Sequence, residues 1–276
     1  MESYKRILFV AVAVVLFSVV LKIPSGALEL DIKNPKDYFI LATEYAKKGD
    51  FEGAVINYTK TIELAPNRID AYFYRGQAYF YMNEYKKALD DFTKVIELRP
   101  GSADAFFKRG NIYMGAGKFE QAIVDYSSAI KLFGESEENS DNPNYIDVVI
   151  NRGRTYGLSG KYNLAIKDFT RMISINPKSS ELYSDRGLAY LRKGDYKKSL
   201  SDYKKAKELE PKNPATYYNL ASFYSVKKNT SRACDLLKDA KKKGFNDLEH
   251  LKEDKDFKNI RKSRCYKKII STWNKQ

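Results

Sequence analysis

The sequence reads Tyr72-x2-Arg75-Gly76-x2-Tyr79 and then repeats this pattern three more times. The further copies are Phe106-x2-Arg109-Gly110-x2-Tyr113, Val149-x2-Arg152-Gly153-x2-Tyr156 and Tyr183-x2-Arg186-Gly187-x2-Tyr190. The first two copies are 34 residues apart, and so are the last two. Weaker copies flank them at Tyr38-x2-Leu41-Ala42-x2-Tyr45 and Tyr217-x2-Leu220-Ala221-x2-Tyr224. A fixed period of this length predicts a repeat array rather than one or two ordinary domains.

A second recurring pattern follows each copy. It consists of a small residue, an aromatic residue or Leu four positions later, and usually a Pro eight positions after that, as in Ala88, Phe92 and Pro100. Numbering each repeat from residues 35, 69, 103, 146, 180 and 214 puts the aromatic, Gly and Tyr of the first pattern at positions 4, 8 and 11. This spacing marks one stripe of a helix. We therefore expect two helices per repeat, with the Gly at position 8 lying close to the small residue at position 20.

The turns between the two helices also recur. Gly stands at position 15 in four repeats, where a left-handed helix end suits it, and Pro at position 32 ends the second helix. The four glycines are Gly49, Gly117, Gly160 and Gly194.

The pattern resembles the tetratricopeptide repeat (TPR), whose signature is W-x2-L-G-x2-Y, then A-x3-F, then P, with a period of 34. The resemblance covers about residues 35–245 and implies an all-α fold, a right-handed superhelix of antiparallel helix pairs. Together with the flanking segments, this predicts a signal peptide or anchor (1–27), repeats 1–3 (35–136), an acidic loop (137–145), repeats 4–6 (146–245) and a basic helical cap (246–276).

One departure from that family pattern predicts ion pairs. Position 7 is Arg instead of Leu in repeats two to five, and the same four repeats carry Asp at position 23. Both residues are missing from repeats one and six. We expect four structural pairs between helices, within or between adjacent repeats, unless a duplication copied both residues without contact. The residues are Arg75, Arg109, Arg152 and Arg186 with Asp91, Asp125, Asp168 and Asp202.

The composition argues against an enzyme. The chain has 276 residues, one His and two Cys, too few for a His/Cys zinc site or for most nucleophile–His pairs. Gly115-Ala116-Gly117-Lys118 looks like part of a phosphate-binding loop, but Phe119 follows where Ser or Thr is needed. We expect no catalytic residue, no cofactor and no metal.

The N-terminus resembles an export signal. Lys5 and Arg6 precede an apolar run at residues 7–21, and small residues Ser25 and Ala27 suit a cleavage site after Ala27. The run would reach only about 22 Å as a helix, short of a bilayer's roughly 30 Å of hydrocarbon. We expect cleavage and export to the periplasm or outside the cell, or else an uncleaved membrane anchor.

The resemblance also predicts where a partner binds. In TPR arrays the first helices line a concave groove through positions 2, 5, 9 and 12, with position 6 beside them. Aromatic and amide side chains there suit an extended or helical peptide. The candidates are Phe73, Tyr74, Gln77, Phe107, Lys108, Asn111, Asn151, Arg154 and Asn219. Phe107, Glu181 and Asp185 stand where some family members need basic residues to hold a C-terminal carboxylate, so we disfavour that mode.

The C-terminal segment carries half of the net charge of +14. Residues 238–276 contain thirteen Lys or Arg and six Asp or Glu. This patch indicates a solvated cap or, alternatively, a site for nucleic acid or an anionic membrane. Cys234 and Cys265 either form one disulfide that joins the cap to the array or remain reduced.

Together these features predict a non-catalytic scaffold that binds a protein or peptide, in an exported or envelope-associated complex. Nucleic acid is not expected as a partner, and the sequence predicts no particular oligomeric state. The alternatives are anionic binding by the cap and an accessory subunit of an envelope enzyme.

Overall fold

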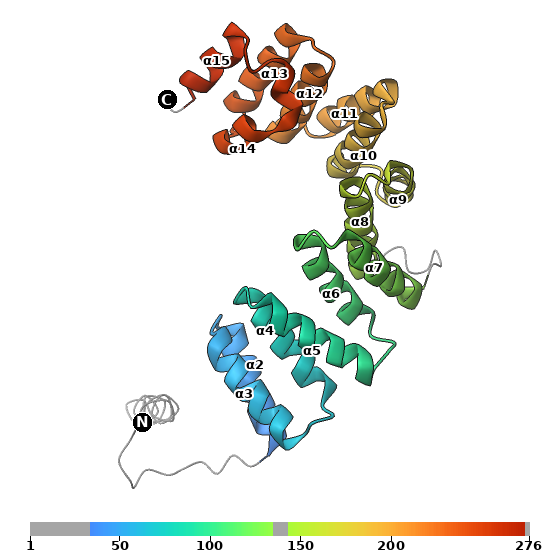
Figure 1. The fold of residues 1–276 in the computed structure, drawn as a ribbon, viewed down its shortest axis with the longest axis vertical. Helices are drawn as coiled ribbons and strands as arrows, with labels where there is room; N and C mark the ends of the chain where they lie inside the picture. The colour runs from blue at the N-terminus through green and yellow to red at the C-terminus, as the bar shows by residue number, and fades with distance from the viewer. Residues whose placement is uncertain (1–33, 135–142, 274–276) are drawn as a thin grey trace, which may run out of the picture. The chain divides into compact units, whose positions relative to one another are not determined.

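The computed structural model describes residues 34–134 and 143–273, and these residues form helices with no β-strand among them (Figure 1). The predicted all-α repeat fold of paired helices is confirmed. The helices are α2 (Pro35–Lys47), α3 (Phe51–Leu64), α4 (Ile69–Tyr81), α5 (Tyr85–Leu98), α6 (Ala103–Gly115), α7 (Phe119–Phe133), α8 (Pro143–Leu158), α9 (Tyr162–Ile175), α10 (Ser180–Lys193), α11 (Tyr196–Leu209), α12 (Pro214–Val226), α13 (Thr230–Lys242), α14 (Leu248–Glu253), the 3₁₀ helix η2 (Lys255–Asn259) and α15 (Arg264–Ser271).

The chain divides into two compact units, one ending at Pro66 and the other beginning at Asn67. In the first unit, α2 packs against α3. The ring of Phe39 lies 5.5 Å from that of Tyr58, whose hydroxyl is 3.2 Å from the Thr43 hydroxyl. Asn34 and Asp50 cap the two helices by accepting backbone N–H bonds.

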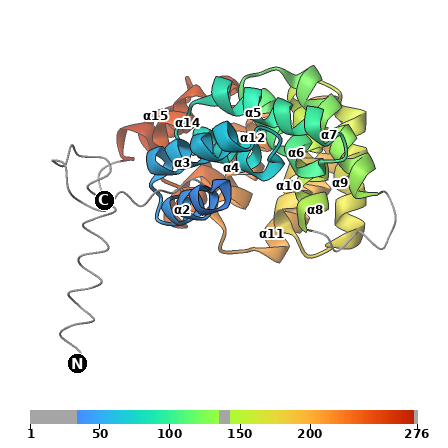
Figure 2. The same cartoon turned by 90° about the horizontal axis from the view of Figure 1, so that it is seen from below.

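The second unit contains five helix pairs, from α4/α5 to α12/α13, followed by the cap. Each second helix packs against the first helix of the next pair, and α8, α9 and α10 lie side by side in two perpendicular views (Figures 1 and 2). Gly117, Gly160 and Gly194 have φ of 70°, 78° and 89° at the turn within their pairs. Asn83 and Lys228 adopt the same left-handed conformation at position 15 of the other two.

Helix α8 begins earlier than the sequence suggested. Pro143 starts it, and Tyr145 is 1% exposed within it, although residues 137–145 were expected to form a loop. Proline suits the first turn of a helix because its missing N–H is not needed there. Residues 137–142 of that segment lie outside the described residues. The other proposed domain boundaries stay predictions.

The glycine at position 8 makes room for an aromatic ring. A Cβ on Gly110 would lie 2.8 Å from Cε1 of Tyr126, and one on Gly153 would lie 2.9 Å from Cε1 of Phe169. These rings stand at position 24, so the atoms nearest to the added Cβ belong to the ring. The expected approach to the small residue at position 20 stays a prediction. The ring lies one helical turn further along the second helix and reaches back to the glycine.

Each arginine at position 7 forms an ion pair with the aspartate sixteen residues later, on the second helix of the same repeat. Nε and Nη2 donate to the two carboxylate oxygens over 2.7 to 2.9 Å in all four pairs. The aspartate side chains are 3–8% exposed and the arginines 17%. Hydrogen bonding to Asp125 raises the pKa of Arg109 above its ordinary value, so this guanidinium stays charged.

Three of these arginines also reach the preceding repeat. Nη1 of Arg109 donates to Oγ1 of Thr93 over 3.1 Å, and Arg152 and Arg186 make the equivalent bonds at 3.3 and 3.2 Å. In repeats two, three and five, rings at positions 4 and 11 both lie near the guanidinium, as Phe106 and Tyr113 do at 5.7 and 5.9 Å from Cζ of Arg109. The arginine therefore joins its own second helix to the second helix of the preceding repeat.

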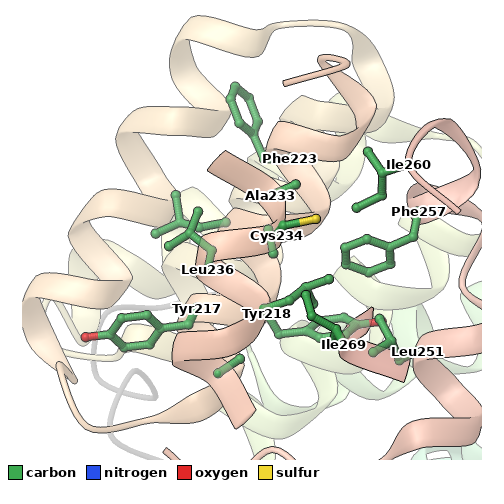
Figure 3. Packing of buried hydrophobic residues seen from close by; sticks show 14 of the residues in the cluster. Tyr217, Tyr218, Phe223, Ala233, Cys234, Leu236, Leu251, Phe257, Ile260 and Ile269 are labelled. Atoms are coloured by element: carbon green, nitrogen blue, oxygen red, sulfur yellow. The ribbon is translucent and has the colours of Figure 1, made fainter. Parts of the chain in front are cut away.

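The cap packs mainly through apolar side chains. Leu251, Phe257 and Ile260 are fully buried against α12 and α13, together with residues of α15 (Figure 3). Arg192 of α10 also donates two bonds to Asp256 of η2, over 2.6 and 3.0 Å. The expected helical cap thus consists of α14 and α15 with η2 between them.

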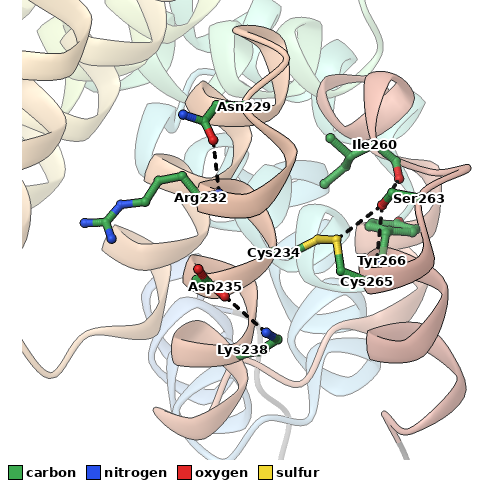
Figure 4. The surroundings of a disulfide bond; sticks show 9 residues. All are labelled: Asn229, Arg232, Cys234, Asp235, Lys238, Ile260, Ser263, Cys265 and Tyr266. Carbon is green, nitrogen blue, oxygen red and sulfur yellow. Dashed lines mark hydrogen bonds and ion pairs between the residues drawn. A yellow bond between two sulfur atoms is a disulfide. The ribbon is translucent and has the colours of Figure 1, made fainter.

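A disulfide joins α13 to the cap, between Cys234 and Cys265 (Figure 4). Of the two alternatives left by the sequence, the structure contains the bonded one. Their Cα atoms are 6.2 Å apart, within the usual range for disulfides.

None of the helices within 34–134 and 143–273 is both long enough and apolar enough to cross a bilayer. The apolar run at residues 7–21 and the cleavage site after Ala27 lie outside the described residues, so both stay predictions.

We expect Arg109→Leu to lower the free energy of unfolding by about 2–4 kcal/mol, because it leaves Asp125 buried without its partner. Adding Asp125→Leu should recover roughly half of the loss, because a buried ion pair replaced by apolar residues is often tolerated. Repeat six already has this leucine pair, with Leu220 at position 7 and Leu236 at position 23. Urea unfolding followed by circular dichroism gives the free energy of unfolding of both variants. A double variant less stable than the single one would contradict the expectation.

Gly110→Ala should destabilise the array by about 1–3 kcal/mol, because its Cβ would overlap the Tyr126 ring. Gly115→Ala on the same helix is the matched control, since a Cβ there meets nothing within 4 Å. The control should be neutral or stabilising. Equal thermal unfolding midpoints for the two variants would refute the role given to Gly110.

Reduction of the disulfide should lower the stability of the C-terminal part, because the bond closes a loop with a sequence separation of 31. Loop-closure entropy for this length corresponds to roughly 3–4 kcal/mol. Hydrogen exchange of α13–α15 with and without reductant provides the measurement, and Cys265→Ser should reproduce the reduced state. Unchanged protection after full reduction would show that the apolar packing holds the cap alone.

Candidate functional site

The candidate site is the first-helix face of the second unit. We define it as the side chains at positions 2, 5, 6, 9 and 12 of α4, α6, α8, α10 and α12. Positions 4, 7, 8 and 11 of the same helices turn toward the second helices, where the arginine pairs and the glycine contacts lie. The face therefore projects from helices whose rotation is fixed by buried contacts.

A first hollow lies between α4 and α6. Gln77, Phe80 and Tyr81 line it from α4, Lys108 and Asn111 line it from α6, and its volume is about 60 Å³. Phe92 of α5 also lines it. Three of the predicted groove residues, Gln77, Lys108 and Asn111, thus meet at one place.

A hydrogen-bond network sets the orientation of Asn111. Its Oδ1 accepts from the Tyr126 hydroxyl over 2.7 Å and from Nδ2 of Asn151 over 3.0 Å. Burial raises the pKa of Tyr126, so the hydroxyl remains a donor. Asn111 therefore offers its own Nδ2 to a partner. Asn151, another predicted residue, serves the network and lines neither hollow described in this subsection.

Two predicted aromatic anchors are mostly used for packing. Phe107 is 8% exposed and lies 6.1 Å from the Tyr126 ring, so it offers almost no surface to a ligand. Phe73 is half-buried against Phe92 at 5.8 Å. Position 5 borders the buried stripe, and a large ring there turns into the core. Tyr74 is 43% exposed.

A second and larger hollow lies between repeats four and five. Its volume is about 340 Å³ and it contains the predicted residue Arg154. The residues lining it come from α8, α9 and α10: Gly153, Arg154, Gly157, Leu158, Tyr162, Phe169, Asp185, Leu188, Ala189 and Arg192. Leu158 and Arg192 were not predicted, and Gly157 and Leu188 lay on the predicted groove stripe without being chosen as candidates. The glycine at position 12 was the signal that could have found this hollow.

The charged side of this hollow is an ion cluster. Arg154 donates from Nε to Asp185 over 2.8 Å and from Nη2 to Glu181 over 2.5 Å. Burial raises the pKa of Asp185, and the nearby Arg154 partly opposes this. Arg154 thus binds both of the carboxylates that stand where some family members carry a basic pair.

Asn219 lies half-buried on α12 and lines neither hollow. Among the residues that line the two hollows, amides, cations and rings predominate, and no hydroxyl or thiol lies beside a histidine. Such groups can bond the backbone of a peptide and enclose its apolar side chains.

The fold is similar to several solved structures. The crystal structure of MamA protein is 28% identical, covers 64% of this chain and 92% of its own, and has a TM-score of 0.58. YrrB, described as a TPR protein with an unusual peptide-binding site, is 22% identical over 71% and 96%, with a TM-score of 0.54. The pilF protein of Pseudomonas aeruginosa is 16% identical over 79% and 95%, at 0.59. At their lower identities the last two show the fold alone.

No curated protein matches the sequence. Three related family models match it in consecutive stretches. The first tetratricopeptide repeat model matches residues 69–102, 103–135 and 180–213, a TPR repeat model matches 42–82, and a second tetratricopeptide repeat model matches 146–179. Together they span more than half of the chain, which therefore belongs to the tetratricopeptide repeat family.

Proposed function

We propose that the protein is a non-catalytic scaffold that binds an extended segment of a partner protein along the first-helix face of α4 to α10. One observation carries this proposal: Gln77, Lys108 and Asn111 converge on one hollow beside the exposed rings of Phe80 and Tyr81. An extended segment presents backbone carbonyls and side chains in alternation, and this arrangement supplies donors next to apolar surface.

Rigidity of the face supports the proposal. The arginine pairs and the Tyr126–Asn111–Asn151 network hold its helices and one of its amides before any partner arrives. Preorganised donors lose less conformational entropy on binding, which increases affinity for a given contact area.

We place this scaffold in an exported or envelope-associated complex. The support is the signal-like order of residues 1–27 and the disulfide between Cys234 and Cys265, since disulfides persist mainly in oxidising compartments. An accessory role beside an envelope enzyme would use the same face.

The basic cap gives a second candidate function. Lys252, Arg261 and Lys267 surround an open hollow of about 360 Å³ whose lining includes Tyr266 and Ile270. An anionic ligand would suit it, and its binding would fall steeply with salt because bound counterions are released. The first-helix face remains the better supported site, since it combines donors, rings and fixed geometry.

A photo-crosslinking amino acid placed at Gln77 in the full chain, in the cells that produce it, tests the main proposal. The same label at Val124, which is 64% exposed on the second helix α7, is the matched control. We expect a discrete protein adduct from position 77 that is weakened by Lys108→Glu and still forms when a cell lysate is irradiated at high salt.

Equal adducts from both positions would indicate nonspecific contact and refute the proposal. If no adduct forms when a lysate is irradiated at high salt, and the chain binds nucleic acid or anionic vesicles at low salt, the function would move to the cap.

A further inference from the structure

The second hollow exists because one side chain is missing. Position 12 carries Phe80 in repeat two, Met114 in repeat three and Leu191 in repeat five, but Gly157 in repeat four. A Cβ built on Gly157 meets nothing within 4 Å. Helix α8 would be at least as stable with a larger residue there, because Gly is a poor helix former. Neither packing nor backbone conformation therefore requires glycine at this position.

The walls of the hollow are apolar and accessible. Leu158 is 63% exposed and Leu188 is 41% exposed, and both border the space with Tyr162. Phe169 is 1% exposed and closes the floor. A dry cavity of about 150 Å³ is enough to hold benzene, so about 340 Å³ accommodates an aromatic or long aliphatic side chain with part of its backbone.

The charges beside the hollow leave a negative surplus. Arg154 is shared by Asp185 and Glu181, and Arg192 is bound by Asp256, so two guanidinium groups face three carboxylates. Glu181 carries the accessible part of that surplus, with a side chain 70% exposed. A cationic group on the ligand complements this side.

We infer that the Gly157 hollow is a socket for one bulky apolar side chain of the bound partner, flanked in the partner's sequence by Lys or Arg. The apolar side chain would stand where Phe80, Met114 and Leu191 place their own side chains in neighbouring repeats. The flanking cation would bond the outer oxygens of Glu181. This inference rests on the proposed function and names the residue type that the face selects.

Two substitutions of the same glycine test the socket without harming the fold. Gly157→Met fills the space with the residue that repeat three already uses, and Gly157→Ala adds one methyl group and leaves the hollow open. Both should keep or raise the thermal unfolding midpoint, because α8 gains helix propensity. Thermal unfolding of both variants is measured first.

The probe is the N-acetylated and C-amidated pentapeptide Gly-Lys-Phe-Lys-Gly, titrated into the full chain with methyl NMR detection of Leu158 and Leu188. Control peptides replace Phe by Ala, or both Lys by Glu. We expect Gly157→Met to weaken binding at least about tenfold through lost apolar burial, and Gly157→Ala to change it less than about threefold. Glu181→Gln should weaken binding of the Lys-containing peptide and leave unchanged the ratio of affinities between the Phe and Ala peptides.

Equal binding by the Met and Ala variants, or no preference for Phe over Ala, would overturn the socket. No preference for Lys over Glu would overturn the cationic flank. The crosslink at position 77 separates these failures from failure of the proposed function. If the adduct persists in Gly157→Met, the face binds its partner without the socket; if it is absent from the unmodified chain, the proposed function itself fails.

Discussion

The arginine at position 7 is the constraint on which the middle of the second unit depends. Arg109 donates two bonds to Asp125 on its own second helix and a third to Thr93 of the preceding repeat, between two aromatic rings. Breaking a buried pair costs more than forming it gains, because the remaining charge is left without a partner. The pair therefore penalises rotation or sliding of one helix along its neighbour.

This constraint also determines what the helices present to solvent. With position 7 turned inward, positions 6, 9 and 12 of the same helix point elsewhere, and their side chains vary from repeat to repeat. The variation is large: Gln77 and Phe80 in one repeat correspond to Arg154 and Gly157 in another. Because the buried residues fix the helices and the exposed positions vary, one repeat fold can provide different local sites. The two hollows differ because of position 12 and because of the charges at positions 6 and 9.

The sequence predicted the features that repeat with the period. Helix pairs, the left-handed turn at position 15 and the partner of Arg75 could all be derived, because each left a residue at a fixed spacing. It missed the hydroxyl at position 25, although Thr93, Ser127 and Thr170 each precede a repeat that contains the arginine. Burial of Phe107 could not be derived, because position 5 lies at the edge of the stripe and its side chain can turn either way. The start of α8 at Pro143 depends on local packing of Tyr145, which no periodic pattern contains.

The arginine–aspartate pairs end at repeat six, next to the cap. At this boundary the hydroxyl, the arginine and the aspartate are all replaced. Lys204 replaces the hydroxyl of repeat five, and Leu220 and Leu236 replace the arginine and the aspartate of repeat six. Both leucines join the apolar cluster that contains Leu251, Phe257 and Ile260 of the cap. An arginine at position 7 of repeat six would find neither its hydroxyl nor its carboxylate, and its charge would be buried without a partner. Apolar packing therefore replaces the ion pair where the cap covers the last pair, and the Cys234–Cys265 disulfide joins the two covalently.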